Sequence, residues 1–67
     1  MPIDSKPAID LLTIAEAAKL LKLSVSGMRR FQQRRQIPFI KLGGSIRFTR
    51  QDLTSFLQRN RVEAVGT

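Results

Sequence analysis

The sequence predicts a mainly α-helical domain with a small β-hairpin, built from three helices and two antiparallel strands. Two observations predict it. Residues that commonly cap helices precede segments with apolar residues at helical spacing, and a glycine pair separates two short runs of strand formers. The chain of 67 residues has room for one domain, which at this size buries about 60% of its unfolded surface. We therefore expect one small core.

The first helix is expected over residues 14–21. Thr13 is followed three residues later by Glu16, the spacing of a capping box. Apolar residues then repeat at helical spacing on one face: Ile14, Ala17, Ala18 and Leu21. A short turn follows, in which Leu23 is expected to fill the core and Ser24 to cap the next helix.

The second helix is expected over residues 25–34. At 100° per residue, one side carries Met28, Phe31, Gln32 and Arg35, and the opposite side carries Ser26, Arg29, Arg30 and Gln33. Two helices joined by a short turn form a helix-turn-helix, whose second helix reads DNA bases. Arginine pairs with guanine, glutamine with adenine, and serine with either, while Val25 could touch a thymine methyl group. The alternative is a solvated helix face, but such faces usually mix in acidic residues.

A hairpin is expected next, with strands over residues 39–42 and 45–48 and a turn at Gly43 and Gly44. We expect one face to be apolar and the other to carry Lys41 and Arg47. A basic hairpin beside a helix-turn-helix is typical of a DNA-binding wing, although a purely structural hairpin fits the same pattern. The two glycines lack the spacing of a nucleotide-binding loop.

The third helix is expected over residues 50–60, capped by Thr49 with Asp52 three residues on. Its apolar stripe, Leu53, Phe56 and Leu57, should close the core. The expected organisation is a flexible N-terminal segment over residues 1–10, a winged helix-turn-helix domain over residues 11–60, and a flexible tail over residues 61–67.

The charge distribution favours nucleic acid as the partner. The formal net charge is +7, the sequence pI is about 11.6, and no acidic residue stands between Glu16 and Asp52. Such a concentrated basic block indicates an anionic partner more strongly than a need for solubility. The alternative is a protein-interaction module whose basic face docks an acidic partner.

Other function classes are disfavoured. The chain has no cysteine and no histidine, so we expect no disulfide, no metal site and no bound cofactor. No nucleophile has an identifiable base, and we expect no enzymatic activity. The apolar runs are far shorter than the roughly 20 residues that span a bilayer, which predicts a soluble intracellular protein without membrane contact.

The predicted DNA-binding residues fall into two groups. Those of the recognition helix are Ser24, Val25, Ser26, Arg29, Arg30, Gln33 and Arg34. Those of the wing are Lys41, Gly43, Gly44, Ser45 and Arg47.

Residues 11–58 resemble the excisionase-like branch of small winged helix-turn-helix proteins, related to the MerR superfamily. The matching pieces, in order, are LTIAEAAKLLKLS, MRRF, IPFIKLGG and IRFTRQDLTSFL. The resemblance implies a recognition helix in a major groove of double-stranded DNA and a wing in the adjacent minor groove. Many relatives are recombination directionality factors: several copies bind beside an attachment site, bend the DNA and direct a site-specific integrase toward excision. Such a role implies a cytoplasmic, nucleoid-associated protein in a bacterial host.

Other relatives are small transcriptional regulators, and the residues alone do not separate the two roles.

Two positions depart from the family pattern. Relatives often carry a glycine at the end of the recognition helix, where this chain reads Arg34, Arg35 and Gln36, so we expect a longer helix or an end without a left-handed cap. The wing tip, Gly43 to Ser45, lacks the basic residue common there, which shifts weight onto Lys41 and Arg47.

Overall fold

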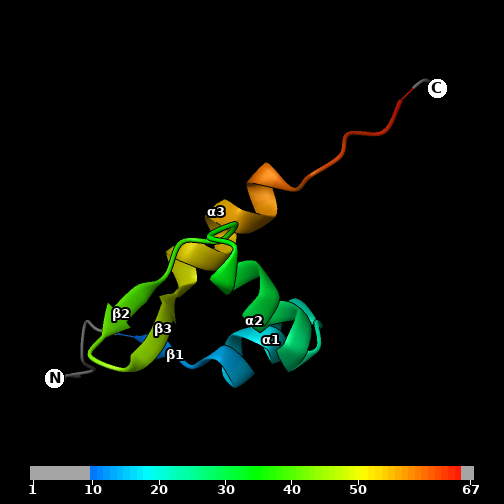
Figure 1. The fold of residues 1–67 in the computed structure, drawn as a ribbon. Coiled ribbons are helices and arrows are strands. Elements are labelled where there is room, and N and C mark those ends of the chain that lie inside the picture. Colours follow the sequence, from blue (N-terminus) through cyan, green and yellow to red (C-terminus); the bar gives the residue numbers. More distant parts are fainter. Residues whose placement is uncertain (1–9, 66–67) are drawn as a thin grey trace, which may run out of the picture.

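A computed structural model describes residues 10–65 of the chain. The elements follow the order β1 (Leu11–Leu12), α1 (Ile14–Leu21), α2 (Val25–Gln33), β2 (Ile40–Leu42), β3 (Ser45–Thr49) and α3 (Arg50–Arg59). Helices α1 and α2 pack against each other, and the hairpin of β2 and β3 extends away from them (Figure 1). The predicted fold class, three helices with a small antiparallel hairpin, is confirmed.

The sheet has one strand more than the sequence predicted. Its order is β1-β3-β2, and Leu11 and Leu12 pair with Thr49 and Phe48 of β3. This pairing joins the segment before α1 to the segment before α3. The wing is therefore anchored at its base by the N-terminal end of the domain.

Side-chain caps explain where α1 and α3 begin. In α1, the Thr13 hydroxyl accepts from the amide of Glu16 at 3.1 Å, and the Glu16 carboxylate accepts from the amide of Thr13 at 2.9 Å. In α3, Thr49 and Asp52 form the same reciprocal pair, with both distances 3.0 Å. Each capping box satisfies two amides that a helix start leaves without partners.

The core gathers side chains from every helix and from β1 and β3. Phe48 and Met28 are completely buried at its centre, and the other members are Leu12, Ala17, Ala18, Ile37, Leu53 and Phe56. Two apolar residues that were expected in the core lie outside it: Leu57 is 54% exposed and Leu23 is 37% exposed. One face of α2 packs against the core, and the opposite face of α2 is exposed to solvent.

Both helices of the helix-turn-helix end in a left-handed residue that is not glycine. Lys22 has φ 58° after α1, and Arg35 has φ 57° after α2. The expected longer helix is not found, because α2 ends at Gln33; its cap residue Arg34 is not left-handed, with φ −87°, and the left-handed residue Arg35 follows that cap. Arg35 therefore lies beyond the helix and does not share the side of Met28.

The structure describes only part of the two terminal segments. The expected flexible segment over residues 1–10 falls outside the described residues except for Asp10, whose carboxylate is 2.7 Å from the guanidinium of Arg50. Of the expected tail, residues 61–65 form neither helix nor strand and extend from the end of α3 (Figure 1). Residues 66–67 are outside the description. Within residues 10–65, no helix has the length and apolar character needed to cross a membrane.

Candidate nucleic-acid interface

The exposed face of α2 carries the predicted base-reading residues. Ser26, Arg29, Arg30, Gln33 and Arg34 are all exposed, whereas Met28 is completely buried. On the back face, the ring of Phe31 meets the ring of Phe56 of α3 edge to face, with centroids 5.0 Å apart. Such aromatic contacts favour one orientation of the two rings, so they help fix which face of α2 points outward.

No acidic side chain among residues 10–65 forms an ion pair with this face. Within residues 10–65, the ion pairs are Arg50 with Asp10 and Arg61 with Glu63, and neither involves α2. Among the described residues, the exposed Arg29 and Arg30 of α2 therefore have no acidic partner that would compete with an outside acceptor. Arginine presents these donors as a planar fork that matches phosphate and the guanine edge.

The start of α2 also lacks a carboxylate. The Ser24 hydroxyl accepts from the amide of Gly27 at 3.0 Å, but glycine occupies the position where α1 and α3 carry Glu16 and Asp52. A β-carbon at Gly27 would lie 3.1 Å from the Ser24 hydroxyl oxygen, which is a tight contact. The first turn of α2 consequently carries no acidic side chain at the positive end of the helix dipole, which suits the approach of an anion.

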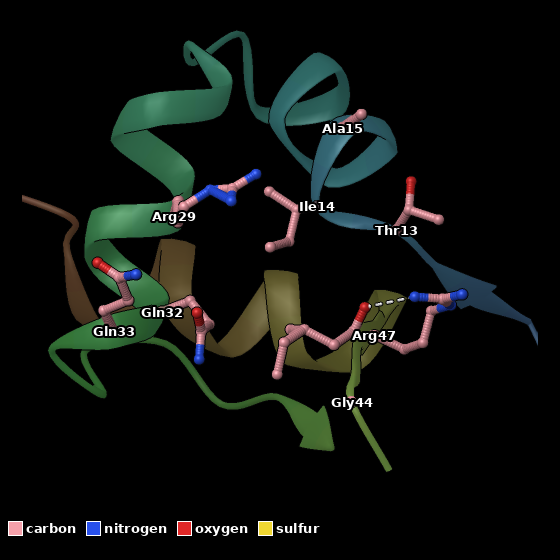
Figure 2. Close-up of a pocket in the computed structure, with 9 residues that line it drawn as sticks. Thr13, Ile14, Ala15, Arg29, Gln32, Gln33, Gly44 and Arg47 are labelled. Atoms are coloured by element: carbon pink, nitrogen blue, oxygen red, sulfur yellow. Dashed lines mark hydrogen bonds between the residues drawn. The ribbon is translucent and has the colours of Figure 1, made fainter. Parts of the chain in front are cut away.

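A cleft separates α2 from the wing. Its volume is about 350 Å³, and it is bordered by Thr13, Ile14, Ala15, Arg29, Gln32, Gln33, Gly44, Ile46 and Arg47. In Figure 2, Arg29 extends from α2 toward Ile14 of α1, while Gln33 lies further along α2. The cleft thus brings residues of the recognition helix and the wing to one hollow, together with the start of α1.

Arg30 of α2 and Arg34, which follows the helix, lie on its other flank. Arg30 and Arg34 border a second, smaller hollow of about 210 Å³ with Gly27, Phe31 and Gln36. The face predicted as one surface is therefore divided between two hollows, with Arg29 and Gln33 beside the wing and Arg30 and Arg34 away from it.

The wing presents its two basic residues on opposite faces. Across the hairpin Ile40 pairs with Arg47, Lys41 with Ile46, and Leu42 with Ser45. Directly opposed residues of antiparallel strands point to the same side of the sheet. Lys41 therefore shares the face of Ile46, and the prediction that Lys41 and Arg47 share one face is wrong.

The two side chains also differ in freedom. Lys41 is exposed, whereas Arg47 is partly buried and its guanidinium donates to the carbonyl of Ile46 at 2.8 Å, the dashed line in Figure 2. At the tip, Gly43 has φ 61°, the left-handed conformation that glycine adopts without a steric penalty. A β-carbon added at Gly43 or Gly44 would have no neighbour within 4 Å, so the tip backbone is open to a ligand.

Sequence reasoning missed five residues that border the cleft, namely Thr13, Ile14, Ala15, Gln32 and Ile46. Gln32 was assigned to the core side of α2 but is only partly buried. Its position one residue before Gln33 puts it at the edge of the exposed arc, and this spacing could have indicated it. The start of α1 could not be indicated in this way, because only the tertiary fold brings it to the wing.

The end of α2 is tied to α3. The guanidinium of Arg59 donates to the carbonyl of Gln36 at 3.2 Å. Arg59 thus has a structural role in holding the segment that follows the recognition helix.

Comparison with models of protein families gave one match. Residues 11–61 match the model of a family that is described as a helix-turn-helix domain. Neither the curated proteins nor the solved structures contain a match to this chain.

Proposed function

Because the chain belongs to the helix-turn-helix domain family, a family of small DNA-binding domains, we propose that it is a sequence-specific, architectural DNA-binding protein of the excisionase type. In this proposal, several copies bind double-stranded DNA beside a recombination attachment site, bend it and direct an integrase toward excision, without catalysis by this chain. The observation that carries the DNA-binding part is the exposed, acid-free face of α2 beside the open wing tip.

The recognition helix supplies the base contacts. Arg29 and Arg30 carry forked donors that suit guanine, and Gln33 suits adenine. On the helical wheel Ser26 lies between these residues, where its short side chain lets the helix approach the bases closely. Val25, 42% exposed at the first turn, is an apolar group of the right size for a thymine methyl.

The cleft between α2 and the wing suits the DNA backbone. A helix in a major groove and a wing in the adjacent minor groove must straddle the phosphates that separate these grooves. The cleft of about 350 Å³ lies at that position, with Arg29 on one side and Gly44 on the other. Lys41 reaches outward from the wing, and the open backbone from Gly43 to Ser45 can approach a groove wall.

The small size of the domain supports the use of several copies. Single DNA-binding modules bury about 600 to 1,000 Å² of protein surface, whereas specific complexes bury about 1,000 to 2,500 Å². Two or more copies on neighbouring sites, or one copy with an integrase, would bring the total into the range of specific complexes.

The test is a gel-shift titration on attachment-site DNA and on intergenic DNA flanking the gene, with competitor DNA present. The proposal predicts a ladder of discrete shifted bands on the attachment-site DNA. Arg61→Ala, which removes one exposed charge from the tail, serves as the control and should give the same ladder.

Other outcomes would redirect the assignment. A single shifted band on a palindromic promoter site would support a small transcriptional regulator of the same fold instead. Absence of sequence preference at any salt concentration would support a module that docks an acidic protein.

A further inference from the structure

Two basic residues occupy backbone conformations that favour glycine. Among residues 10–65, Lys22 and Arg35 are the non-glycine residues with positive φ, at 58° and 57°. Lys22 stands in the turn before α2, and Arg35 follows the end of α2. The recognition helix is therefore flanked at both ends by a cationic residue in a left-handed conformation.

Both residues belong to the same helix-ending motif. After α1, the amide of Leu23 donates to the carbonyl of Ala18 at 2.8 Å, and that of Lys22 to the carbonyl of Lys19 at 3.2 Å. After α2, the amide of Gln36 donates to Phe31 at 2.9 Å, and that of Arg35 to Gln32 at 3.0 Å. These are the two bonds of a Schellman motif, in which the left-handed position is usually glycine.

The motif itself does not use either side chain. Its hydrogen bonds are made by backbone atoms, and glycine would adopt the same conformation without the clash between the β-carbon and the carbonyl oxygen. Both side chains are exposed, and within the described part of the chain neither makes a hydrogen bond or an ion pair. Among residues 10–65, therefore, no side-chain hydrogen bond or ion pair of Lys22 or Arg35 offsets the cost of the left-handed conformation.

The dimensions of α2 suggest what the side chains can reach. A helix of nine residues is about 14 Å long, so both of its ends stay close to a groove that is roughly 12 Å wide. If α2 occupies the groove, cationic side chains just beyond its two ends come near the phosphates that border the groove. Lysine and arginine are the residues that commonly bind such phosphates.

We propose that Lys22 and Arg35 bind DNA phosphates that border the major groove that α2 enters. The inference rests on the proposed DNA binding and adds two residues to the interface. In this proposal the left-handed conformations serve DNA binding, because each places a cation at one end of the recognition helix. The cost is a lower folding stability.

The test compares Lys22→Gly, Arg35→Gly and the double variant with the wild-type protein. Each glycine should increase the folding equilibrium constant by about five-fold or more, because the left-handed conformation no longer carries a steric penalty. Each should also reduce the association constant for duplex DNA by roughly five-fold near 0.15 M salt, the effect of one lost phosphate contact. Opposite changes in stability and affinity cannot result from misfolding.

Urea unfolding gives the stability, and fluorescence anisotropy with a duplex selected by the wild-type protein from a random pool gives the affinity. For each glycine, the slope of log K against log salt should become shallower by about 0.9, without a change in the preferred sequence. Arg61→Gly is the charge-matched control. Lys22→Asn and Arg35→Asn remove the charge but tolerate the left-handed conformation, and they should bind as weakly as the glycine variants.

Three results would overturn the inference: glycine variants that bind with the wild-type slope, an equal loss of slope in Arg61→Gly, or glycine variants that are less stable than the wild type. Failure of the proposed function is distinguishable, because the wild-type protein itself would then not bind the duplex.

Discussion

The contact between Phe31 and Phe56 provides a measurable link between the core and the candidate interface. The ring centroids are 5.0 Å apart with an interplanar angle of 67°. Edge-to-face pairs of this kind contribute about 0.5–1.5 kcal/mol beyond the area they bury. A domain of this size has a total stability of roughly 3–10 kcal/mol, so Phe→Ala changes, at about 3–5 kcal/mol each, could unfold it. Leucine is the better substitution, because it retains an apolar side chain.

We predict that Phe31→Leu and Phe56→Leu are coupled. Either single variant loses the ring–ring interaction and adds a packing cost of less than about 1.5 kcal/mol. The double variant loses the ring–ring interaction only once. Its destabilisation should therefore be smaller than the sum of the two single values by about 0.5–1.5 kcal/mol.

Urea denaturation followed by far-ultraviolet circular dichroism measures the free energies of unfolding of all four proteins. The control cycle combines Phe56→Leu with Leu20→Ala, because Leu20 is 50% exposed on the outer side of α1, and it should be additive. Additivity of the Phe31 and Phe56 changes within about 0.3–0.5 kcal/mol would refute the reasoning. It would mean that the ring contact does not hold α2 to α3.

Three further predictions separate reading, positioning and structural roles. Arg30→Ala should weaken binding by about 1–3 kcal/mol and relax the preference at one base pair, whereas Lys41→Ala should weaken binding to all sequences alike. Affinities for a library of duplexes with single-base changes measure both effects. The reverse pattern would mean that the roles of the helix and the wing are misassigned. Ser24→Ala removes the cap of α2 and should lower the free energy of unfolding by about 0.5–2 kcal/mol in a urea titration, while Ser24→Gly should cost only a few tenths; equal losses would argue against the hydroxyl cap. Leu57→Ser should change stability by less than about 0.5 kcal/mol, because this side chain is 54% exposed; a loss near 2 kcal/mol would place it in the core.

The helices were predictable because their signals are local. Thr13 with Glu16 and Thr49 with Asp52 marked the starts of α1 and α3, and Ser24 marked the start of α2. Each cap acts within three residues of the chain, so its pattern can be read without the fold. The side of α2 that carries Met28 was predicted for the same reason.

The sheet depended on distant parts of the chain and was predicted less well. β1 has two residues and can be recognised as a strand only because it pairs with β3. The two faces of the wing were misassigned because the alternation was continued across the turn with the same parity. A two-residue turn opposes Leu42 to Ser45, so residues of opposite parity share a face.

The left-handed residues could not be read from propensity, because Lys22 and Arg35 are poor choices for that conformation. Their backbone is set by the hydrogen bonds that end each helix. The division of the α2 face between two hollows likewise follows from tertiary packing, since the hollow beside Arg29 needs the wing and the start of α1. The exposed side of α2 was predictable from the sequence, but the grouping of its side chains around two hollows was not.

If the basic surface of this chain binds duplex DNA, the affinity should depend strongly on salt concentration. The measurement is the association constant for a fluorescent duplex over a series of salt concentrations. If about five phosphates are neutralised, log K should fall with log salt with a slope near −4 to −5. A slope near zero would contradict the account, because base and phosphate contacts from these arginines and lysines cannot form without releasing the counterions of the DNA.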